Sequence, residues 1–353
     1  METTAVPTAQ KRSLLRSEAL QQLLAFGALI LIFVFFSSQS ANFFQFSNIV
    51  SILTATAVNG ILALGVTFVI ITSGIDLSIG AVMALSAVMT GVFITFWHWP
   101  MLLGILGGVG TGTVAGMING AFIAKLKIPP FIATLGMLNI AKGLALVFSG
   151  LKPIYFSDTP DFNNGAMGSA LGTFIPGFDI PNIVLVLFGA AIVGSLVLTK
   201  TILGRYTFAL GSNEEAARLS GINVDRWKIV VYAVCGLFAG LAGVVIAARL
   251  NSAQPATGPG YELDAIAAAV IGGTSLSGGE GTILGTIIGA FIISTLNNGL
   301  RIMSVPQEWQ TVVTGTIVIL AVYLDILRRG EQKINLSRGI FQSFRGWFGR
   351  PTG

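Results

Sequence analysis

The stretch KTILGRYTFALGSNEEAARLSGINVDRWK, from Lys200 to Lys228, is the one substantial polar segment in the middle of an otherwise apolar chain. It carries five basic and three acidic residues, and long apolar segments lie on both sides of it. Charged residues between apolar segments are typical of a loop that leaves the membrane. The predicted membrane spans are therefore counted outward from this loop.

The composition is that of a membrane protein. The chain has 353 residues, of which 53% are hydrophobic and only 10% are charged, and its mean hydropathy is +0.82. A soluble domain is normally about 25% charged. Apolar segments of about 18 or more residues indicate membrane helices, and this chain has many of them. The predicted fold class is an all-α integral membrane protein.

Ten apolar segments are separated by polar or glycine-rich breaks. They cover residues 23–36, 48–72, 78–96, 101–124, 131–149, 182–199, 229–250, 263–273, 282–300 and 308–327. The polar lead before the first segment is long and no clear cleavage site follows it, which favours an uncleaved span over a signal peptide. The eighth segment is short enough to be re-entrant. The prediction is about ten transmembrane helices, within a range of eight to ten.

The basic residues give the orientation. Their clusters at 11–16, 125–127, 200–228 and 328–350 hold 16 of the 20 basic residues. An even number of predicted spans separates each cluster from the next, so all four lie on one side, which the positive-inside rule makes cytoplasmic. This predicts cytoplasmic termini: a tail over 1–21, a transmembrane domain over 22–327 with the loop 200–228, and a basic tail over 328–353.

Glycines recur every fourth residue in three of the segments: Gly104, Gly108, Gly112, Gly116 and Gly120; Gly236 and Gly240; and Gly281, Gly285 and Gly289. This spacing places them on one helix face, where small residues let membrane helices approach closely. Either static tight packing or a sliding face fits the pattern. We favour static packing.

Several polar residues lie within or between apolar segments and are candidates for a substrate route: Asn59, Ser73, Asp76, Ser78, Asn139, Thr274, Ser275 and Ser277. They would either hydrogen-bond a polyhydroxylated solute or connect helices to one another. For Asp76 and Ser78 the favoured interpretation is a cap at the start of the third span. Lys142 is expected either to pair with a carboxylate such as Asp76 or to snorkel to the interface.

Tyr261, Glu262 and Asp264 follow a loop rich in proline and glycine. Two interpretations remain open for this group. The residues would either face a docking partner outside the membrane or, as we favour for the two acids, stabilise the start of a helix through its dipole.

Several kinds of chemistry find no support in the sequence. With one histidine, His98, and one cysteine, Cys235, neither a histidine-based metal site nor an internal disulfide is expected. No lysine follows a glycine, so the chain has no Gly-Lys-Ser/Thr phosphate loop. We expect no catalytic residues, no metal and no cofactor. The positive charge beside apolar segments is a topology signal and predicts contact with lipid rather than nucleic acid.

Within the polar loop, Ser212-Asn213-Glu214-Glu215 supplies capping groups and first-turn acids for a helix, and Gly221 ends it. A helix of about two turns over 213–220 is too short to be stable alone. It would either insert into a groove on a partner or pack on its own protein, and we favour the partner.

The residues Glu215-Ala216-Ala217-x-x-x-Gly221 resemble the Glu-Ala-Ala…Gly loop of bacterial ABC importer permeases. The ribose-type sugar permeases are similar over residues 40–327. The segments that carry this resemblance are SGIDLSIG (73–80), FIATLG (131–136), GRYTFALGSNEEAARLSGINV (204–224), AQP (253–255), YELDAIAA (261–268), GGTSLSGG (272–279) and LNNGL (296–300).

This resemblance implies a multi-pass permease of an ABC importer in the bacterial inner membrane. It implies a second permease copy, a cytoplasmic ABC ATPase that binds the ATP, and a periplasmic sugar-binding protein as partners. The implied contact with the ATPase consists of Asn213, Glu214, Glu215, Ala216, Ala217, Arg218 and Gly221. The implied substrate is ribose or a similar sugar, with hexoses, inositol and furanose sugars also open. A secondary transporter or channel without an ATPase is the alternative, and a membrane enzyme is a third.

Overall fold

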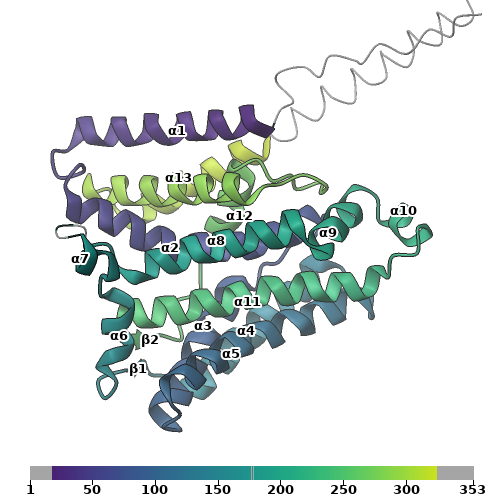
Figure 1. The fold of residues 1–353 in the computed structure, drawn as a ribbon, viewed down its shortest axis with the longest axis horizontal. Coiled ribbons are helices and arrows are strands. Elements are labelled where there is room, and N and C mark those ends of the chain that lie inside the picture. Colours follow the sequence, from purple (N-terminus) through teal and green to yellow (C-terminus); the bar gives the residue numbers. More distant parts are fainter. Residues whose placement is uncertain (1–17, 176, 178, 324–353) are drawn as a thin grey trace, which may run out of the picture.

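The computed structural model describes residues 18–175, 177 and 179–323, and almost all of its regular structure is helical (Figure 1). The long helices are α1 (Glu18–Gln39), α2 (Phe46–Ile71), α3 (Ile79–Gly91) continued by a π-helical turn (Val92–Phe96), α4 (Met101–Ala124), α5 (Pro130–Ser149), α8 (Asn182–Lys200), α11 (Val224–Leu250) and α13 (Ile283–Ile302). The shorter elements are β1 (Ile154–Tyr155), α6 (Pro160–Met167), α7 (Ala170–Phe174), α9 (Ile202–Ser212), α10 (Glu214–Leu219), β2 (Ser252–Ala253) and α12 (Tyr261–Ile271). Residues 307–323 are helical as well.

Within the described residues, the eight long helices are long and apolar enough to cross a membrane. They correspond to eight of the predicted spans. The segment predicted at 263–273 forms α12, whose 11 residues are too few to cross a bilayer. The last predicted span is helical as far as residue 323, and the rest of it and the two predicted tails lie outside the described residues.

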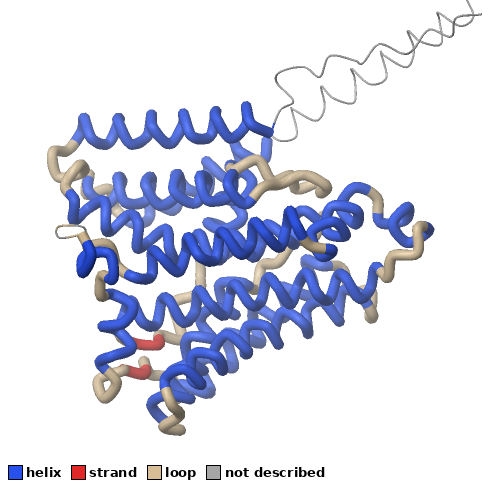
Figure 2. The backbone as a smooth tube through the Cα atoms, viewed as in Figure 1, coloured by secondary structure: helices blue, strands red, loops and turns tan. Residues whose placement is uncertain are grey.

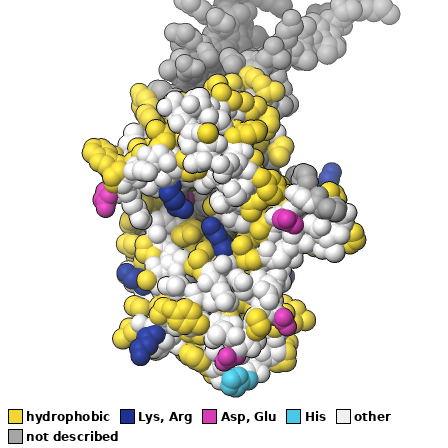
Figure 3. All heavy atoms as spheres, turned by 90° about the vertical axis from the view of Figure 1, so that its left-hand side faces the viewer, with side chains coloured by type: hydrophobic (Ala, Val, Ile, Leu, Met, Phe, Trp, Pro, Cys, Tyr) yellow, Lys and Arg dark blue, Asp and Glu magenta, His cyan; other side chains and the backbone are white. Residues whose placement is uncertain are grey.

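The spanning helices run side by side along the longest axis of the molecule (Figures 1 and 2). Helix α10 lies at one end, and α6, α7 and the two strands lie at the other. The second end carries few charged side chains, scattered among apolar and uncharged ones (Figure 3). The strands pair antiparallel, with Ile154 opposite Ala253 and Tyr155 opposite Ser252. Neither this pair nor the helices α6 and α7 were expected in the loop regions.

The spanning helices differ widely in burial. The buried share of the most apolar window is 89% for α3 with its π-helical turn and 72% for α2, but only 11% for α1. Helix α1 therefore lies at the edge of the bundle, where it packs mainly on α13. The exposed side chains of α1, such as Leu31 and Phe35, are apolar. Apolar exposure of this kind is what contact with lipid acyl chains requires.

Helices α4 and α11 share the most extensive helix–helix contact among the described residues. At their crossing Gly112 faces Gly236, and a Cβ atom on either glycine would meet the backbone of the other helix. Only glycine permits two backbones to approach so closely. This contact confirms that the spaced glycines mark tight packing.

Two interruptions of the helices contact one another. The first joins α2 to α3 over residues 72–78, and the second joins α12 to α13 over residues 272–282. The Ser73 hydroxyl donates to the carbonyl of Ser277 at 2.8 Å, and the Gly279 N–H donates to the carbonyl of Ile71 at 2.8 Å. These bonds satisfy backbone groups that the broken helices leave free.

Candidate functional site

Helix α10 forms as the capping residues predict. The Asn213 side chain accepts a hydrogen bond from the Ala216 N–H at 2.9 Å, which caps the helix, and Glu214 and Glu215 lie in its first turn. Beyond the C-cap Ser220, Gly221 adopts a φ of +83°, the left-handed conformation that favours glycine. The short helix at 213–220 is thereby confirmed within one residue at each end.

One side of α10 is attached to its own protein. Ala217 is buried in a small apolar cluster with Leu210 of α9 and Val224 of α11. Glu214 pairs with Lys228 of α11 at 2.7 Å and, within α10, with Arg218 at 3.3 Å. Helix α10 is therefore positioned by both neighbouring helices.

The other side of α10 is free for a partner. Glu215, Ala216, Arg218, Leu219 and Ser220 are all exposed, and the Leu219 side chain is 83% exposed. In the part of the chain that the structure describes, the Glu215 carboxylate has no ion-pair partner. An exposed leucine beside an unpaired acid suits insertion into a groove of a second protein.

Helix α9 connects α10 to the interrupted spans. A Cβ atom at Gly211, near the end of α9, would collide with the carbonyl of Ile71 and with the N–H of Gly279. The end of α2, the break before α13 and the end of α9 therefore meet backbone to backbone.

Asp76 lies in the first break and is buried. Its Oδ1 accepts from the Ser78 hydroxyl at 2.6 Å and from the Ser78 N–H at 2.9 Å, and the Asn119 amide donates to the Ser78 hydroxyl at 2.9 Å. The Asp76 carboxylate accepts from the N–H of Ser78, the N-cap residue of α3, so it satisfies a backbone group at the start of this span as expected. The Ser78 side chain makes no capping bond to the first turn.

The polar residues of the second break lie close to the first. Thr274 and Ser275 are buried, and the Ser275 hydroxyl accepts from the N–H of Ser277, which is itself exposed. The structure thus brings together Ser73, Ser277 and their neighbours, but it separates them from Asn59 and Asn139. Whether any of them contacts a solute stays a prediction.

The two asparagines within spans have opposite environments. Asn59 is buried on α2, and both polar atoms of its amide lack a hydrogen-bond partner among the described residues. Asn139 is exposed on α5, and its amide donates only to the carbonyl of Leu135, one turn earlier. Lys142, on the same helix, is exposed and forms no ion pair with Asp76 or any other described carboxylate. The pairing alternative for Lys142 is therefore wrong.

Tyr261, Glu262 and Asp264 form the first turn of α12, as expected for the two acids. This turn lies within the bundle. The Asp264 carboxylate accepts from the Asn297 amide of α13 at 3.3 Å, and the Glu262 carboxylate lies against Gly80 at the start of α3. Docking of a partner at these residues stays a prediction.

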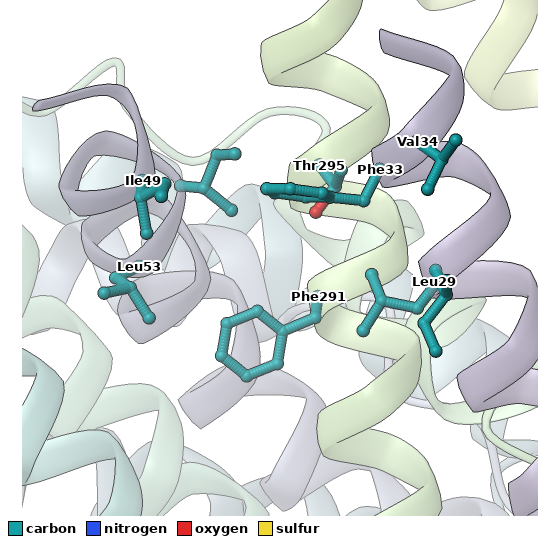
Figure 4. Close-up of a pocket in the computed structure, with 9 residues that line it drawn as sticks. Leu29, Phe33, Val34, Ile49, Leu53, Phe291 and Thr295 are labelled. Carbon is teal, nitrogen blue, oxygen red and sulfur yellow. The ribbon is translucent and has the colours of Figure 1, made fainter. Parts of the chain in front are cut away.

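An apolar groove of about 280 Å³ opens between α1, α2 and α13 (Figure 4). It is lined by Leu29, Ile30, Phe33, Val34, Ile49, Ile52, Leu53, Phe291 and Thr295. Eight of these nine side chains offer no hydrogen bond, so the groove does not suit a polyhydroxylated solute. Among the described residues, no three His, Cys, Asp or Glu side chains are grouped as a metal site.

Sequence reasoning missed the residues that connect α10 to the spans. Ile71 and Gly211 carry no chemical signal, and their contact joins segments 140 residues apart. Tyr232 of α11 was also missed, although its hydroxyl donates to the carbonyl of Ile75 beside Asp76 at 3.2 Å. A tyrosine within a long apolar span was the available signal, because its hydroxyl needs a partner when buried.

Comparison with known proteins gives a consistent result. The family described as the permease component of the branched-chain amino acid transport system matches residues 48–322. The ribose import permease protein of Bacillus subtilis (strain 168) is 45% identical over 325 residues, which cover 92% of this chain and 98% of that protein. The protein of the same name from Escherichia coli (strain K12) is 42% identical, over 84% of this chain and 91% of its own length.

A third relative bears the name of a different sugar. The xylose transport system permease protein of Escherichia coli (strain K12) is 35% identical, over 91% of this chain and 95% of its own. No solved structure was found to match the chain.

Proposed function

The chain belongs to the family of permease components described for branched-chain amino acid transport systems, and from this membership we propose that it passes ribose, or a similar monosaccharide, across the membrane. It is the permease subunit of an ABC sugar importer, a multi-pass protein of the bacterial inner membrane, and not itself an enzyme. The observation that carries the sugar assignment is the match at 45% identity along 98% of a ribose import permease.

The geometry of α10 supports coupling to a separate ATPase. Its exposed residues Glu215 and Leu219 would contact the ATPase, while Ala217 and Glu214 hold the helix on α9 and α11. Movement of the ATPase on binding and hydrolysing ATP would displace α10 and, through Gly211, the two broken helices. This would favour one of two arrangements of the spans and so alternate access between the two sides.

We further propose ten membrane segments with both termini in the cytoplasm. Nine crossings would be made by the eight long helices and the helix that begins at residue 307, and the tenth by α12 together with the non-helical segments on either side of it. The Lys127–Asp225 pair at 2.7 Å lies with α10 at the cytoplasmic end of this arrangement. Two copies of the chain would form the path, with a sugar-binding protein on the outer side.

Uptake of radiolabelled ribose and xylose tests this proposal in cells that lack their own pentose importers. The cells express the permease with its ATPase and its binding protein. We expect ribose uptake that disappears when the Walker lysine of the ATPase is replaced. Ribose uptake that persists with the inactive ATPase would instead indicate a secondary transporter, and uptake of xylose alone would overturn the assignment of ribose.

A further inference from the structure

The apolar groove between α1, α2 and α13 is open on the side of α1 (Figure 4). Its floor includes Ile52 of α2 and Thr295 of α13, whose side chains are buried. Its rim includes Ile30 and Val34 of α1, with 48% and 59% of the side chain exposed. Beside this rim the apolar side chain of Leu31 is also exposed. The groove is therefore continuous with the apolar outer surface of α1.

The groove lies at the depth of the acyl chains of the membrane. Its α2 residues, from Ile49 to Leu53, are the fourth to the eighth of that helix, so they lie about 5–10 Å from its start. Its α1 residues, from Leu29 to Val34, belong to the second half of α1. The hydrocarbon layer of a bilayer is about 30 Å thick. The groove therefore lies within this layer, in the half nearer the turn between α1 and α2.

Aromatic side chains separate the groove from the turn between α1 and α2. The ring of Phe43, in that turn, lies 5.2 Å from the ring of Phe33 and 5.5 Å from that of Phe36. Phe33 lines the groove, and Phe36 and Phe43 are buried. An occupant therefore enters the groove sideways from the bilayer, and not along the helices from the aqueous side.

The size and lining of the groove select a thin apolar occupant. An α-helix is about 10 Å across, so the groove volume of about 280 Å³ corresponds to less than one helical turn. A stable protein–protein interface uses about 20–30 residues on each side, whereas nine residues line this groove. Apolar cavities of about 150 Å³ stay free of water and take up apolar molecules such as benzene. The groove therefore suits an apolar chain better than a helix, a second protein or water.

We propose that the groove binds one acyl chain of a membrane phospholipid, which lies between α1 and α2 and rests on α13. Helix α1 packs mainly on α13, so the acyl chain fills the space that separates α1 from α2. The rings of Phe33 and Phe291 extend into this space (Figure 4). An acyl chain supplies the van der Waals contacts that these rings lack on that side. The bound lipid thereby completes the attachment of α1 to the bundle.

Photolabelling tests the proposal in the full-length permease, held in nanodiscs of phosphatidylethanolamine and phosphatidylglycerol. The probe is a phosphatidylethanolamine with a diazirine at the middle of one acyl chain, and mass spectrometry locates the labelled residues after irradiation. Ile52 reports on the floor of the groove. Ile293, buried on another side of α13, is the matched control. Two variants complete the design: Leu53→Trp, which fills the groove, and Ile192→Trp, at an exposed position in the middle of α8.

We expect label at Ile52 and none at Ile293, because only the groove admits an acyl chain to a buried side chain. Leu53→Trp should lose the label at Ile52 but keep the label at Leu31, which any surrounding lipid can reach. Ile192→Trp should leave both labels unchanged. Adding phosphatidylethanolamine to the detergent-purified permease should raise its melting temperature by mass action, and by less in Leu53→Trp.

No more label at Ile52 than at Ile293 would overturn the proposal, and so would a label at Ile52 that persists in Leu53→Trp. If Leu53→Trp does not fold, Val34→Trp blocks the groove from its exposed rim and should remove the same label. An unlabelled Ile52, together with a disulfide between two copies of a Val34→Cys variant made in the Cys235→Ser background, would show that a second copy covers the groove instead. None of these measurements uses a sugar or an ATPase, so their outcome is independent of the proposed function.

Discussion

Glu214 and Glu215 are adjacent in sequence, but their carboxylates lie in different environments. Glu214 is paired with Lys228 and Arg218, whereas Glu215 points away from the protein and has no described ion-pair partner. The same contrast separates Asn59, which is buried, from Asn139, which is exposed. At the scale of single residues, function follows from the direction in which a side chain points.

Glu215→Lys is expected to abolish stimulation of the ATPase by the loaded binding protein, because it reverses the charge of the exposed face of α10. The permease itself should keep its melting temperature, since Glu215 makes no ion pair within the described residues. The measurement is the ATPase rate of the reconstituted complex. Glu214→Gln is the matched control, and it should retain most of the stimulation because exposed ion pairs contribute only about 0.2–1 kcal/mol. Normal stimulation in Glu215→Lys would contradict the coupling role.

Asp76→Leu is expected to lower the stability of the permease, because it leaves the Ser78 N–H and hydroxyl without their acceptor in a buried place. An unsatisfied buried group costs about 1–3 kcal/mol. Asp76→Asn keeps an acceptor oxygen at the same position and should melt within a few degrees of the native protein. The check is thermal unfolding in detergent, and equal melting of both variants would exclude the hydrogen-bonding role.

At the scale of elements, the sequence predicted local capping signals but did not predict contacts between distant segments. The cap of α10 was predictable because Asn213, Glu214 and Gly221 act on the backbone within a few residues. The contact of Gly211 with Ile71 and Gly279 was not, since packing between distant segments leaves no mark in one sequence. Helix α9 was missed for a related reason, because it lies within a polar segment that resembles a loop until the apolar side of the helix packs on a neighbour.

The glycine pattern predicted close packing but not the partner. Gly104 to Gly120 lie on one helix face, and only the structure shows that Gly112 meets Gly236 of α11. A neighbouring glycine, Gly110, lies on another side of the same helix, and a Cβ atom added there would meet nothing within 4 Å. Gly112 and Gly110 therefore provide a direct comparison.

Gly112→Ala is expected to separate α4 from α11, because its methyl group would overlap the backbone of Gly236 and Gly240. Overpacking of this kind costs typically about 1–3 kcal/mol. The yield of folded protein and its melting temperature should both fall, whereas Gly110→Ala should match the native protein. Equal losses in the two variants would indicate an effect of helix propensity and not of the crossing.

At the scale of the whole molecule, the described part of the chain has two unlike ends. All three of its ion pairs lie near α10, among Lys127, Glu214, Arg218, Asp225 and Lys228. The opposite end has Trp97 and Trp99 packed with Phe93, an aromatic group of the kind found at membrane interfaces. Charge counting alone predicted this polarity, because the distribution of basic residues follows the membrane and not the tertiary fold.

The proposed orientation predicts opposite labelling of two exposed positions. In the Cys235→Ser background, Thr173→Cys on α7 should react with an impermeant maleimide in intact cells, or in spheroplasts where an outer membrane blocks access. Ser220→Cys beside α10 should react only after the membrane is opened. Labelling of both positions in sealed cells, or the reverse order, would refute the orientation.

The edge position of α1 has a consequence for biosynthesis. The Gln22 amide of α1 donates a hydrogen bond to the hydroxyl of Thr282, the residue that precedes α13. Thr282 lies 260 residues later in the chain. At about 5–20 residues per second, the ribosome needs roughly 15 to 50 s to synthesise the chain from Gln22 to Thr282.

Helix α1 can remain surrounded by lipid during this interval, since its mean hydropathy is 2.2 and only 11% of its most apolar window is buried in the finished protein. Helix α2, with 72% of its window buried and Asn59 within it, must wait beside α1 with a polar amide unprotected. A membrane chaperone that shields α2 during this interval would raise the yield of the native permease.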